Sequence, residues 1–593
     1  MKAFQKDMVR TVRGNLSRFI AMLFIIAVGI CFVTGISGIS PKILNSIDEL
    51  YQKQNVPDVI IKSKSAAGFS AEELALLKKA GGTLTSMTEI DTKDSDTRLS
   101  VVDFNRKVDR FVLKAGRFPE NADEVAVEQS GSHIAKRAVG DQITVNGRDY
   151  KIAGIVFNPL ILSTEGTVNQ MNRSKYLKTI VYFSADHNPF MQGQLPVTDV
   201  YLKFDGMPGY FDDGYLDKAE KKTEAVKKDL KAAGYNTDGY VFMTLKQEYG
   251  YAYIKKIMDN VDVLARVFPV FFILVVGLLT LTNMSRLIDE DRPRIGCLMS
   301  LGYAPGQILT RYLGFAAAST AIGEAIGLAA GVRIIPDLVY EAVRTAVFLP
   351  EKATGRVYLP TGIISAVLMF AAVMLVTGIV ARKTVRERPV GLFFARAQKP
   401  GRKILLEKIR PVWDHMSFKY KSTWRNIFRY KGRLWMIVIS ITGSTLLVMA
   451  GLGVYDCVGD LKGIDTVALA ILVFALLLSV LVLYNITTMN IGERTREIAT
   501  LEVLGYKAAE VDGYIYREIV IMATFGILIG IPAGTAFLYF IFKKLEFGGL
   551  GEMHAVTYIL AFVISELFVF LVVLLTKHHV KRVDMNASLK SLE

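Results

Sequence analysis

Eight stretches of about 20 residues carry almost no charged side chains, and each is long enough to cross the hydrocarbon core of a bilayer as a helix. In a chain with 51% apolar and only 21% charged residues, this pattern excludes a disordered, fibrous or ordinary soluble protein. The sequence therefore predicts an integral membrane protein. The predicted spans are residues 19–40, 264–285, 312–332, 359–381, 434–454, 467–488, 519–541 and 556–576.

The distribution of charge predicts the orientation. Residues 382–433, between the fourth and fifth spans, hold sixteen Lys or Arg and three Asp or Glu, a net +13 in a chain whose total is +15. Loops rich in Lys and Arg stay in the cytoplasm, and the basic residues of 1–18 and 577–593 agree. An even number of spans then puts both termini in the cytoplasm. The basic charge thus indicates membrane topology, and no nucleic-acid partner is expected.

The longest polar segment, residues 41–262, separates the first two spans and is predicted to be extracytoplasmic. Alternating apolar residues and turn signals such as Asn146-Gly147 predict strands, and helical periodicity appears twice, so we expect an α+β domain. The predicted strands include 98–104, 110–114, 142–145 and 150–157, and the predicted helices are 71–79 and 217–233.

No catalytic or metal-binding pattern accompanies this domain. The six histidines lack metal-ligand spacing, and Gly-x-Ser-x-Gly does not occur. The dipeptide Gly-Lys, which a phosphate-binding P-loop requires, is absent from the chain. We therefore expect no enzyme activity, no metal and no cofactor in this chain.

The chain contains an internal duplication. An offset of 203 residues superposes Ile-x-x-Leu-x-x-Leu-Gly-Tyr at 295–303 on the same pattern at 498–506, and it also carries Glu290 onto Glu493. An offset of 415 superposes Lys6, Arg10 and Arg18 on Lys421, Arg425 and Arg433. We therefore expect two fused four-helix units. The predicted parts are 1–18, the span 19–40, the domain 41–262, the first unit 264–381, the linker 382–433, the second unit 434–576 and the tail 577–593.

Each half also repeats a row of three glycines, four residues apart, in its third span. They are Gly323, Gly327, Gly331, Gly526, Gly530 and Gly534. Such a row lets another helix approach closely. The two rows could meet at a seam between the halves, or each could pack within its own half, and the sequence leaves both open.

A charged amphipathic segment joins the second and third spans of each half, at 286–311 and 492–517. The apolar positions Ile498, Leu501 and Leu504 recur every three residues, so one side can pack while the charges face the cytoplasm. The duplicated pattern favours a docking surface for a cytoplasmic partner. A helix lying on the membrane surface is the alternative.

These features resemble the FtsX/MacB-like permease subunits of ABC transporters. The resemblance lies in the Glu-Arg-x-Arg-Glu-Ile-x-x-Leu-x-x-Leu-Gly-Tyr run at 493–506, the glycine-rich helix after it, and the outer domain after the first helix. Within that domain, Leu-Lys-Ala-Gly-Arg-Phe-Pro at 113–119 and Ala-Gly-Ile-Val at 153–156 are similar to the extracytoplasmic core domain of that family.

The resemblance implies a bacterial plasma-membrane protein that works with a separate cytoplasmic ATPase, two subunits per chain. Nucleotide-driven closure of the ATPase pair would move the outer domain, for export or extraction of an amphiphilic peptide, lipid or drug. The residues implied in ATPase docking are Glu290, Arg292, Arg294, Gly302, Glu493, Arg494, Arg496, Glu497 and Gly505. The first copy departs from the pattern at 291–295, so its dock is expected to be weaker or asymmetric. Only one outer domain is present, so no clamp between two such domains is expected.

Two other functions remain open. The chain could be a regulatory scaffold whose outer domain activates an extracellular enzyme such as a cell-wall hydrolase. It could also be a secondary transporter, for which Glu324 is the one acidic residue within the predicted third span.

Overall fold

The computed structural model describes residues 10–79, 82–90, 97–129, 137–162, 177–190, 195–345, 347–353, 358–393, 404, 407, 410–429, 431–458, 464–493, 503, 505–506, 508–545, 551 and 553–580. It divides into two compact units. The membrane unit consists of Met1–Gly38, Asp262–Val339 and Tyr358–Glu593. The α+β unit consists of Ile39–Val261 and Tyr340–Val357.

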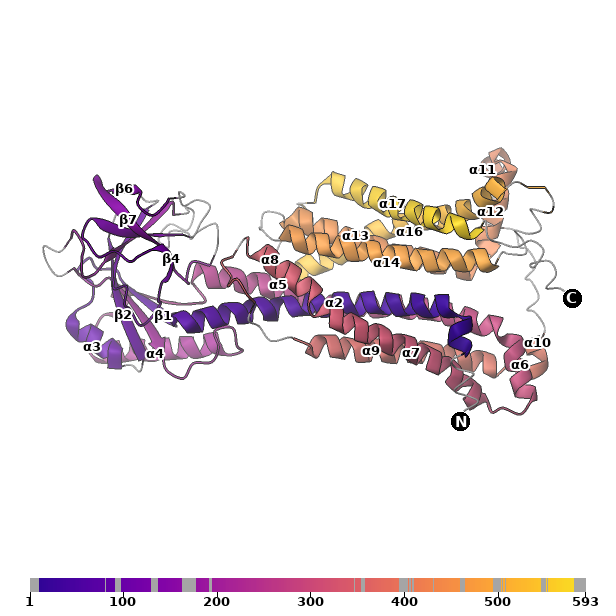
Figure 1. Cartoon of the computed structure of the whole chain (residues 1–593), viewed down its shortest axis with the longest axis horizontal. Helices are drawn as coiled ribbons and strands as arrows, with labels where there is room; N and C mark the ends of the chain where they lie inside the picture. The colour runs from indigo at the N-terminus through magenta and orange to yellow at the C-terminus, as the bar shows by residue number, and fades with distance from the viewer. Residues whose placement is uncertain are drawn as a thin grey trace. The chain divides into compact units, whose positions relative to one another are not determined.

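The α+β unit is built on a ten-stranded mixed sheet with the order β10-β1-β9-β2-β3-β8-β5-β7-β4, and β6 pairs with β7 (Figure 1). Two of its neighbouring pairs, β3 with β8 and β5 with β7, are parallel. The strands are β1 Val59–Ser63, β2 Gly82–Ile90, β3 Thr97–Val102, β4 Val112–Gly116, β5 Glu124–Glu128, β6 Gln142–Val145, β7 Arg148–Phe157, β8 Thr179–Ser184, β9 Asp199–Phe204 and β10 Tyr240–Thr244.

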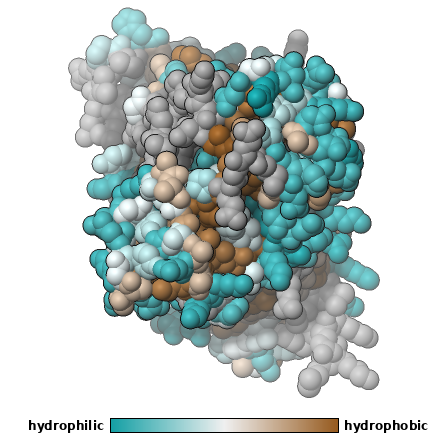
Figure 2. All heavy atoms as spheres, turned by 90° about the vertical axis from the view of Figure 1, so that its left-hand side faces the viewer, coloured by the Kyte–Doolittle hydropathy of each residue, from teal (hydrophilic) through white to brown (hydrophobic). Residues whose placement is uncertain are grey.

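Two apolar clusters hold this sheet. One joins Leu99, Val127 and Val181 from its central strands. The other joins strand residues such as Val200 to Leu77 of α3 (Ala71–Lys79) and Val226 of α4 (Tyr215–Ala232). The face of this unit seen in Figure 2 carries many hydrophilic residues, as expected for a domain that folds in water.

Local turn chemistry explains the β6–β7 hairpin. Asn146 and Gly147 have φ values of 50° and 81°, and positive φ at both central residues is the mark of a type I′ turn. The turn predicted at Asn146-Gly147, the strand predicted at 142–145 and the helix predicted at 71–79 are confirmed.

One segment groups differently from the prediction. The sequence assigned all of 264–381 to the first permease unit, whereas Tyr340–Val357 belongs to the α+β unit. The N–H of Phe348 donates to the carbonyl of Leu162 over 2.8 Å, and its ring lies 5.2 Å from that of Phe157. An apolar loop residue packed on a distant strand leaves no periodic signal in the sequence.

Among the described residues, eight helices are long and apolar enough to cross a membrane, which confirms the predicted architecture. Short helices lie between them: α6 Arg292–Ser300, α8 Ile334–Val343, α10 Pro389–Phe393, α11 Arg410–His415 and α12 Phe418–Arg429. The long helices are α2 Leu16–Gln54, α5 Tyr249–Glu290, α7 Pro305–Gly331 (which α8 follows), α9 Pro360–Val385, α13 Lys431–Val458, α14 Ile464–Glu493, α16 Ala508–Leu545 and α17 Ala555–Val580.

The glycine row of the first half packs on the first helix of that half. A Cβ atom added at Gly327 of α7 would lie 2.6 Å from the carbonyl oxygen of Ala27 and 2.9 Å from the Cβ of Ile30, both in α2. Gly323 and Gly331 of the same row also face α2.

The second half repeats this arrangement at the two sequence offsets. A Cβ at Gly530 of α16 would lie 2.6 Å from the Cβ of Thr445 and 3.1 Å from the carbonyl oxygen of Thr442, both in α13. Thr445 is 415 residues after Ile30, and Gly530 is 203 residues after Gly327. The glycines therefore pack within each half, and the seam between halves that the sequence left open does not lie at these rows.

The two halves instead contact each other through α2, α5 and α14. The buried Nδ2 of Asn485 in α14 donates to the Oδ1 of Asn283 in α5 over 3.1 Å. The rings of Phe32 in α2 and Phe474 in α14 lie 4.9 Å apart. A hydrogen bond between amides inside a helical bundle fixes the relative register of the two helices that carry them.

Candidate coupling site

The segment after the second helix of the first half forms a sharp helical elbow. Helix α5 ends at Glu290, α6 follows at once, and α7 begins at Pro305. Gly302 has φ 88°, and the N–H groups of Gly302 and Tyr303 donate to the carbonyls of Met299 and Leu298. This is a Schellman ending, which needs a left-handed residue and therefore favours glycine.

The second half repeats the turn. Helix α14 ends at Glu493, Gly505 has φ 90°, and α16 begins at Ala508. The left-handed residue therefore lies at the same repeat position, 203 residues further on.

An ion pair to the turn before α10, and close packing on α10 itself, hold α6 in place. The guanidinium of Arg292 contacts both carboxylate oxygens of Glu387, over 3.2 and 2.5 Å. A Cβ atom at Gly296 would lie 3.2 Å from Leu392 and 3.3 Å from Phe393. Only 9% of the Arg292 side chain is exposed, so this residue faces inward, and its part in docking stays a prediction.

A second buried arginine joins the elbow to the N-terminal segment. The Nε of Arg311 in α7 donates to Oγ1 of Thr11 over 2.8 Å, and its Nη2 lies 3.2 Å from the Oδ2 of Asp291. The hydroxyl of Tyr312 donates to the same carboxylate. Arg311 is 2% exposed, so it links three segments inside the protein.

The second half has a polar contact at the same repeat positions with different side chains. The Nδ2 of Asn426 in α12 donates to the hydroxyl of Tyr514 in α16 over 2.8 Å. Asn426 is 415 residues after Thr11, and Tyr514 is 203 residues after Arg311. In both halves a short segment before the first helix is thus tied to the start of the third.

The outward side of the elbow remains exposed. Arg294 and Cys297 are exposed on α6, and Leu301 beyond it is 70% exposed. Tyr303 and its repeat equivalent Tyr506 are 46% and 49% exposed. Each half therefore presents an aromatic ring directly after its left-handed glycine.

The other predicted docking residues divide into two groups. Glu290 is half exposed and accepts from Arg18 and Arg286, and Glu493 ends α14. Arg494, Arg496 and Glu497, with the apolar positions Ile498, Leu501 and Leu504, lie outside the described residues.

Sequence reasoning missed the pairs Arg292–Glu387 and Arg311–Thr11. Their partners are 95 and 300 residues apart. A search at both offsets would have drawn attention to Thr11 and Arg311, because each has a polar or aromatic counterpart at its repeat position.

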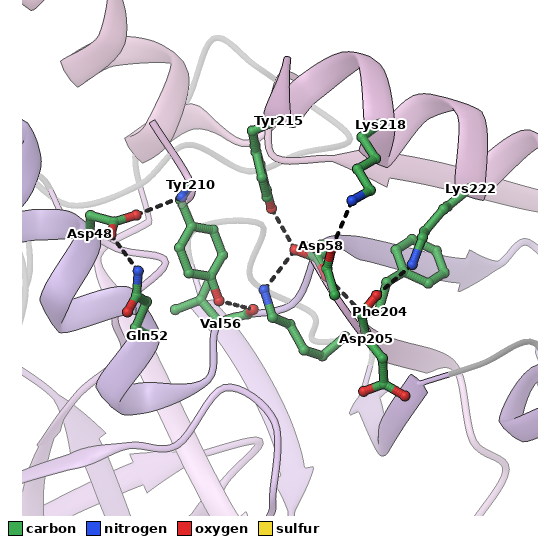
Figure 3. A network of polar contacts seen from close by, with 12 residues as sticks. Asp48, Gln52, Val56, Asp58, Phe204, Asp205, Tyr210, Tyr215, Lys218 and Lys222 are labelled. Carbon is green, nitrogen blue, oxygen red and sulfur yellow. Dashed lines mark hydrogen bonds and ion pairs between the residues drawn. The ribbon is translucent and has the colours of Figure 1, made fainter. Parts of the chain in front are cut away.

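In the α+β unit, the loop between β9 and α4 lies between parts of α2 and α5. The N–H of Tyr210 donates to Oδ1 of Asp48 in α2 (Figure 3). The carbonyl of Tyr210 accepts from the hydroxyl of Tyr251 in α5 over 2.8 Å. The ring of Tyr210 meets that of Tyr51 edge to face, and Phe211 stacks on Tyr251. The loop therefore ties the two helices to each other.

Asp58, at the start of β1, holds the other side of this loop. Its buried carboxylate accepts from Nζ of Lys203, the hydroxyl of Tyr215 and the N–H of Phe204, over 2.8, 2.6 and 2.7 Å (Figure 3). A buried carboxylate with three donors orders the segments that supply them.

Burial raises the pKa of Glu248, which precedes α5, to about 7, and the nearby Asp109 adds to this, although the N–H of Tyr251 opposes it. Because the pKa of Glu248 in the unfolded chain is about 4.3, the folded form binds more protons between pH values of about 4.3 and 7. The stability of the folded form therefore falls as pH rises toward 7.

We expect Glu248→Gln to stabilise the α+β unit by about 2 kcal/mol at about pH 8 and to have little effect at about pH 4.5. Denaturant unfolding followed by near-UV tyrosine signals measures this. Exposed Glu120→Gln is the matched control, and an equal effect of Glu248→Gln at both pH values would contradict the expectation.

Comparison with known proteins agrees with this geometry. The model of the FtsX-like permease C-terminal region matches residues 266–390 and 469–576, two segments whose first residues are again 203 apart. The model of the MacB-like periplasmic core domain matches residues 19–203. No curated protein sequence matches the chain.

Among solved structures, the chain matches the periplasmic region of MacB from Actinobacillus actinomycetemcomitans at 14% identity. The match covers 36% of this chain and 98% of that one, with a TM-score of 0.19. The two family models, the eight apolar helices and the α+β unit identify the chain as an ABC transporter permease of the FtsX/MacB-like family.

Proposed function

We propose that the chain is the membrane subunit through which a separate cytoplasmic ATPase moves the extracytoplasmic domain, for export or extraction of an amphiphilic peptide, lipid or drug. Both termini and the linker 382–433 lie in the cytoplasm in this proposal, because that linker carries most of the net positive charge. The two elbows are the docking sites, one for each of two ATPase subunits.

The observation that carries the proposal is the continuity of α5. This single helix begins next to the Tyr210 loop, to which Tyr251 is bonded, and it ends at Glu290, directly before α6. A displacement of α6 by an ATPase would therefore act on a helix whose other end is fastened to the α+β unit. All 42 residues of α5 are helical, with Pro269 inside the helix.

Two features support docking at the elbow. Exposed apolar groups, Leu301 and Tyr303, lie beside the exposed Arg294, which is the mixture found in protein interfaces. The ion pair between the buried Arg292 and the half-buried Glu387 holds α6 in place, so in this proposal an applied force moves the helix as a body.

The test is reconstitution of the full chain with the ATPase that copurifies with it. We expect the permease to stimulate ATP hydrolysis, and we expect alanine at Glu493, Arg494, Arg496 and Glu497 to abolish the complex. The matched control replaces Glu220, Lys221, Glu224 and Lys228 on α4, which also removes two acids and two bases. An intact, stimulated complex after the first set of changes would contradict docking at the second elbow.

In the regulatory alternative the α+β unit moves in the same way but no substrate is transported. The contacts of Tyr210 with α2 and α5 would transmit the movement in both functions. Flux of a labelled amphiphile in vesicles favours export. Crosslinking of the α+β unit to a secreted enzyme without flux favours the scaffold. A secondary transporter would need charged side chains near the middle of the bundle, and the buried Glu324 is the residue on which the sequence based that alternative.

A further inference from the structure

All three tryptophans of the chain lie within one short stretch, at positions 413, 424 and 435. This stretch, residues 410–435, comprises α11, α12 and the first turn of α13, and we call it the tryptophan segment. Figure 1 places α11 and α12 at the end of the bundle where α10 and α6 also lie. Tryptophan concentrates at the boundary between lipid and water, so its confinement here marks that boundary.

Helix α12 has an apolar side that packs on the bundle. Ile427 is buried, and the ring of Trp424 meets Phe525 of α16 edge to face, with centroids 5.8 Å apart. Phe525 belongs to a membrane-spanning helix and is 42% exposed. The inner side of α12 therefore reaches the level at which lipid begins.

The other side of α12 is basic and exposed. Lys419, Arg425 and Arg429 are exposed, and the guanidinium of Arg425 lies 5.3 Å from the ring of Trp413 while also bonding Glu407. The whole segment holds seven Lys or Arg against one Asp, a net +6 with His415 neutral. Basic groups are thus held at the same level as the aromatic rings.

An exposed ring marks where the segment meets the bilayer. Trp435 is 59% exposed in the first turn of α13, and Tyr420 is 48% exposed beneath the guanidinium of Arg517, 5.2 Å away. Exposed aromatic rings beside clustered cations suit a surface that is apolar below and negatively charged above.

We infer that the tryptophan segment binds the headgroups of anionic phospholipids in the leaflet where α13 begins. The rings enter the upper acyl region, and Lys419, Arg425 and Arg429 contact the phosphates. The net charge of the segment is complementary to an anionic surface, and each basic residue near such a surface adds to the attraction. This inference does not depend on docking of an ATPase.

The tryptophans provide the probe, because they report on this segment alone. The full chain is placed in phosphatidylcholine vesicles with equal small fractions of brominated phosphatidylglycerol or brominated phosphatidylcholine, and quenching of tryptophan fluorescence is compared. We expect the anionic lipid to associate about fivefold more strongly, which is the contribution of a single basic residue near an anionic surface. Raising the salt concentration should weaken this preference through screening.

Three variants make the test specific. Lys419→Gln, Arg425→Gln and Arg429→Gln together should remove the preference, while quenching by brominated phosphatidylcholine should persist if the fold is intact. Arg425→Lys with Arg429→Lys keeps the charge and should keep the preference. The matched control, Lys221→Gln, Lys228→Gln and Lys231→Gln on α4, removes the same charge from the α+β unit and should change nothing.

Equal quenching by the two lipids would overturn the inference. So would a preference that survives the triple substitution. If that substitution leaves the lipid preference intact but releases the copurifying ATPase, the basic side is a protein contact and lipid binding is refuted. Because the lipid measurement uses the permease alone, its failure is distinguishable from failure of the proposed coupling function.

Discussion

Leucine at Gly327 should separate the first and third helices of the first half and destabilise the membrane unit by about 2 to 3 kcal/mol or more. Even a methyl group there would lie 2.6 Å from the carbonyl oxygen of Ala27, and backbone cannot move aside as a flexible side chain can. Gly530→Leu should have a similar effect in the second half, where the obstacle is the Cβ of Thr445. Thermal unfolding of the full chain in detergent, followed by tryptophan fluorescence and by loss of the monodisperse peak, measures both.

The matched control is Gly378→Leu in α9. A Cβ at Gly378 would meet no atom within 4 Å, so the same change of residue in another spanning helix adds bulk without a clash. We expect this variant to keep the unfolding midpoint of the unmodified protein. Equal loss of stability in all three variants would mean that helix propensity or lipid contact, not close packing, decides the outcome.

We expect reversal of charge at Arg292 to decrease the stimulation of ATP hydrolysis at least about tenfold. A loss of more than about 1.4 kcal/mol in the free energy that holds α6 in its coupling position corresponds to that factor. Arg292→Glu places two carboxylates together where the ion pair with Glu387 now stands, and these side chains are 9% and 33% exposed, so water screens only part of the repulsion. Helix α6 then loses its ion pair with the turn before α10. The rate of ATP hydrolysis in the reconstituted complex is the measurement.

A second substitution separates positioning from contact. Adding Glu387→Arg to Arg292→Glu restores opposite charges, and we expect most of the stimulation to return. Arg294→Glu alters the exposed side of α6, so it should weaken the complex in a way that Glu387→Arg does not rescue. Failure of the charge swap, with normal expression and folding, would count against a purely positioning role for Arg292.

Much of the fold was predictable because its signals are local. The absence of charge over about 20 residues is sufficient to identify a span, since the cost of burying charge in lipid is large. Asn146-Gly147 predicted the turn because few other dipeptides adopt positive φ at both residues. The left-handed turns at Gly302 and Gly505 follow the repeated Leu-Gly-Tyr pattern.

Distant pairings were not predictable in the same way. Strand β5 pairs with β7 in parallel and with β8 antiparallel, and nothing in its five residues specifies either neighbour. Phe348 docks on the α+β unit from a loop almost 200 residues after Phe157. Arg292 was expected to take part in ATPase docking because of the family resemblance, and nothing in that resemblance indicates its ion pair with Glu387, 95 residues away.

Fusion of the two halves has a consequence for how such a protein can change. In a homodimer, one substitution alters two symmetric positions at once, and both must tolerate it. Here Thr11 and Arg311 in one half correspond to Asn426 and Tyr514 in the other, so the same joint has been rebuilt with unrelated chemistry. Because one gene encodes both copies, a substitution in one half leaves the other half unchanged. The contact between the N-terminal segment and the third helix can therefore become stiffer or softer in each half independently.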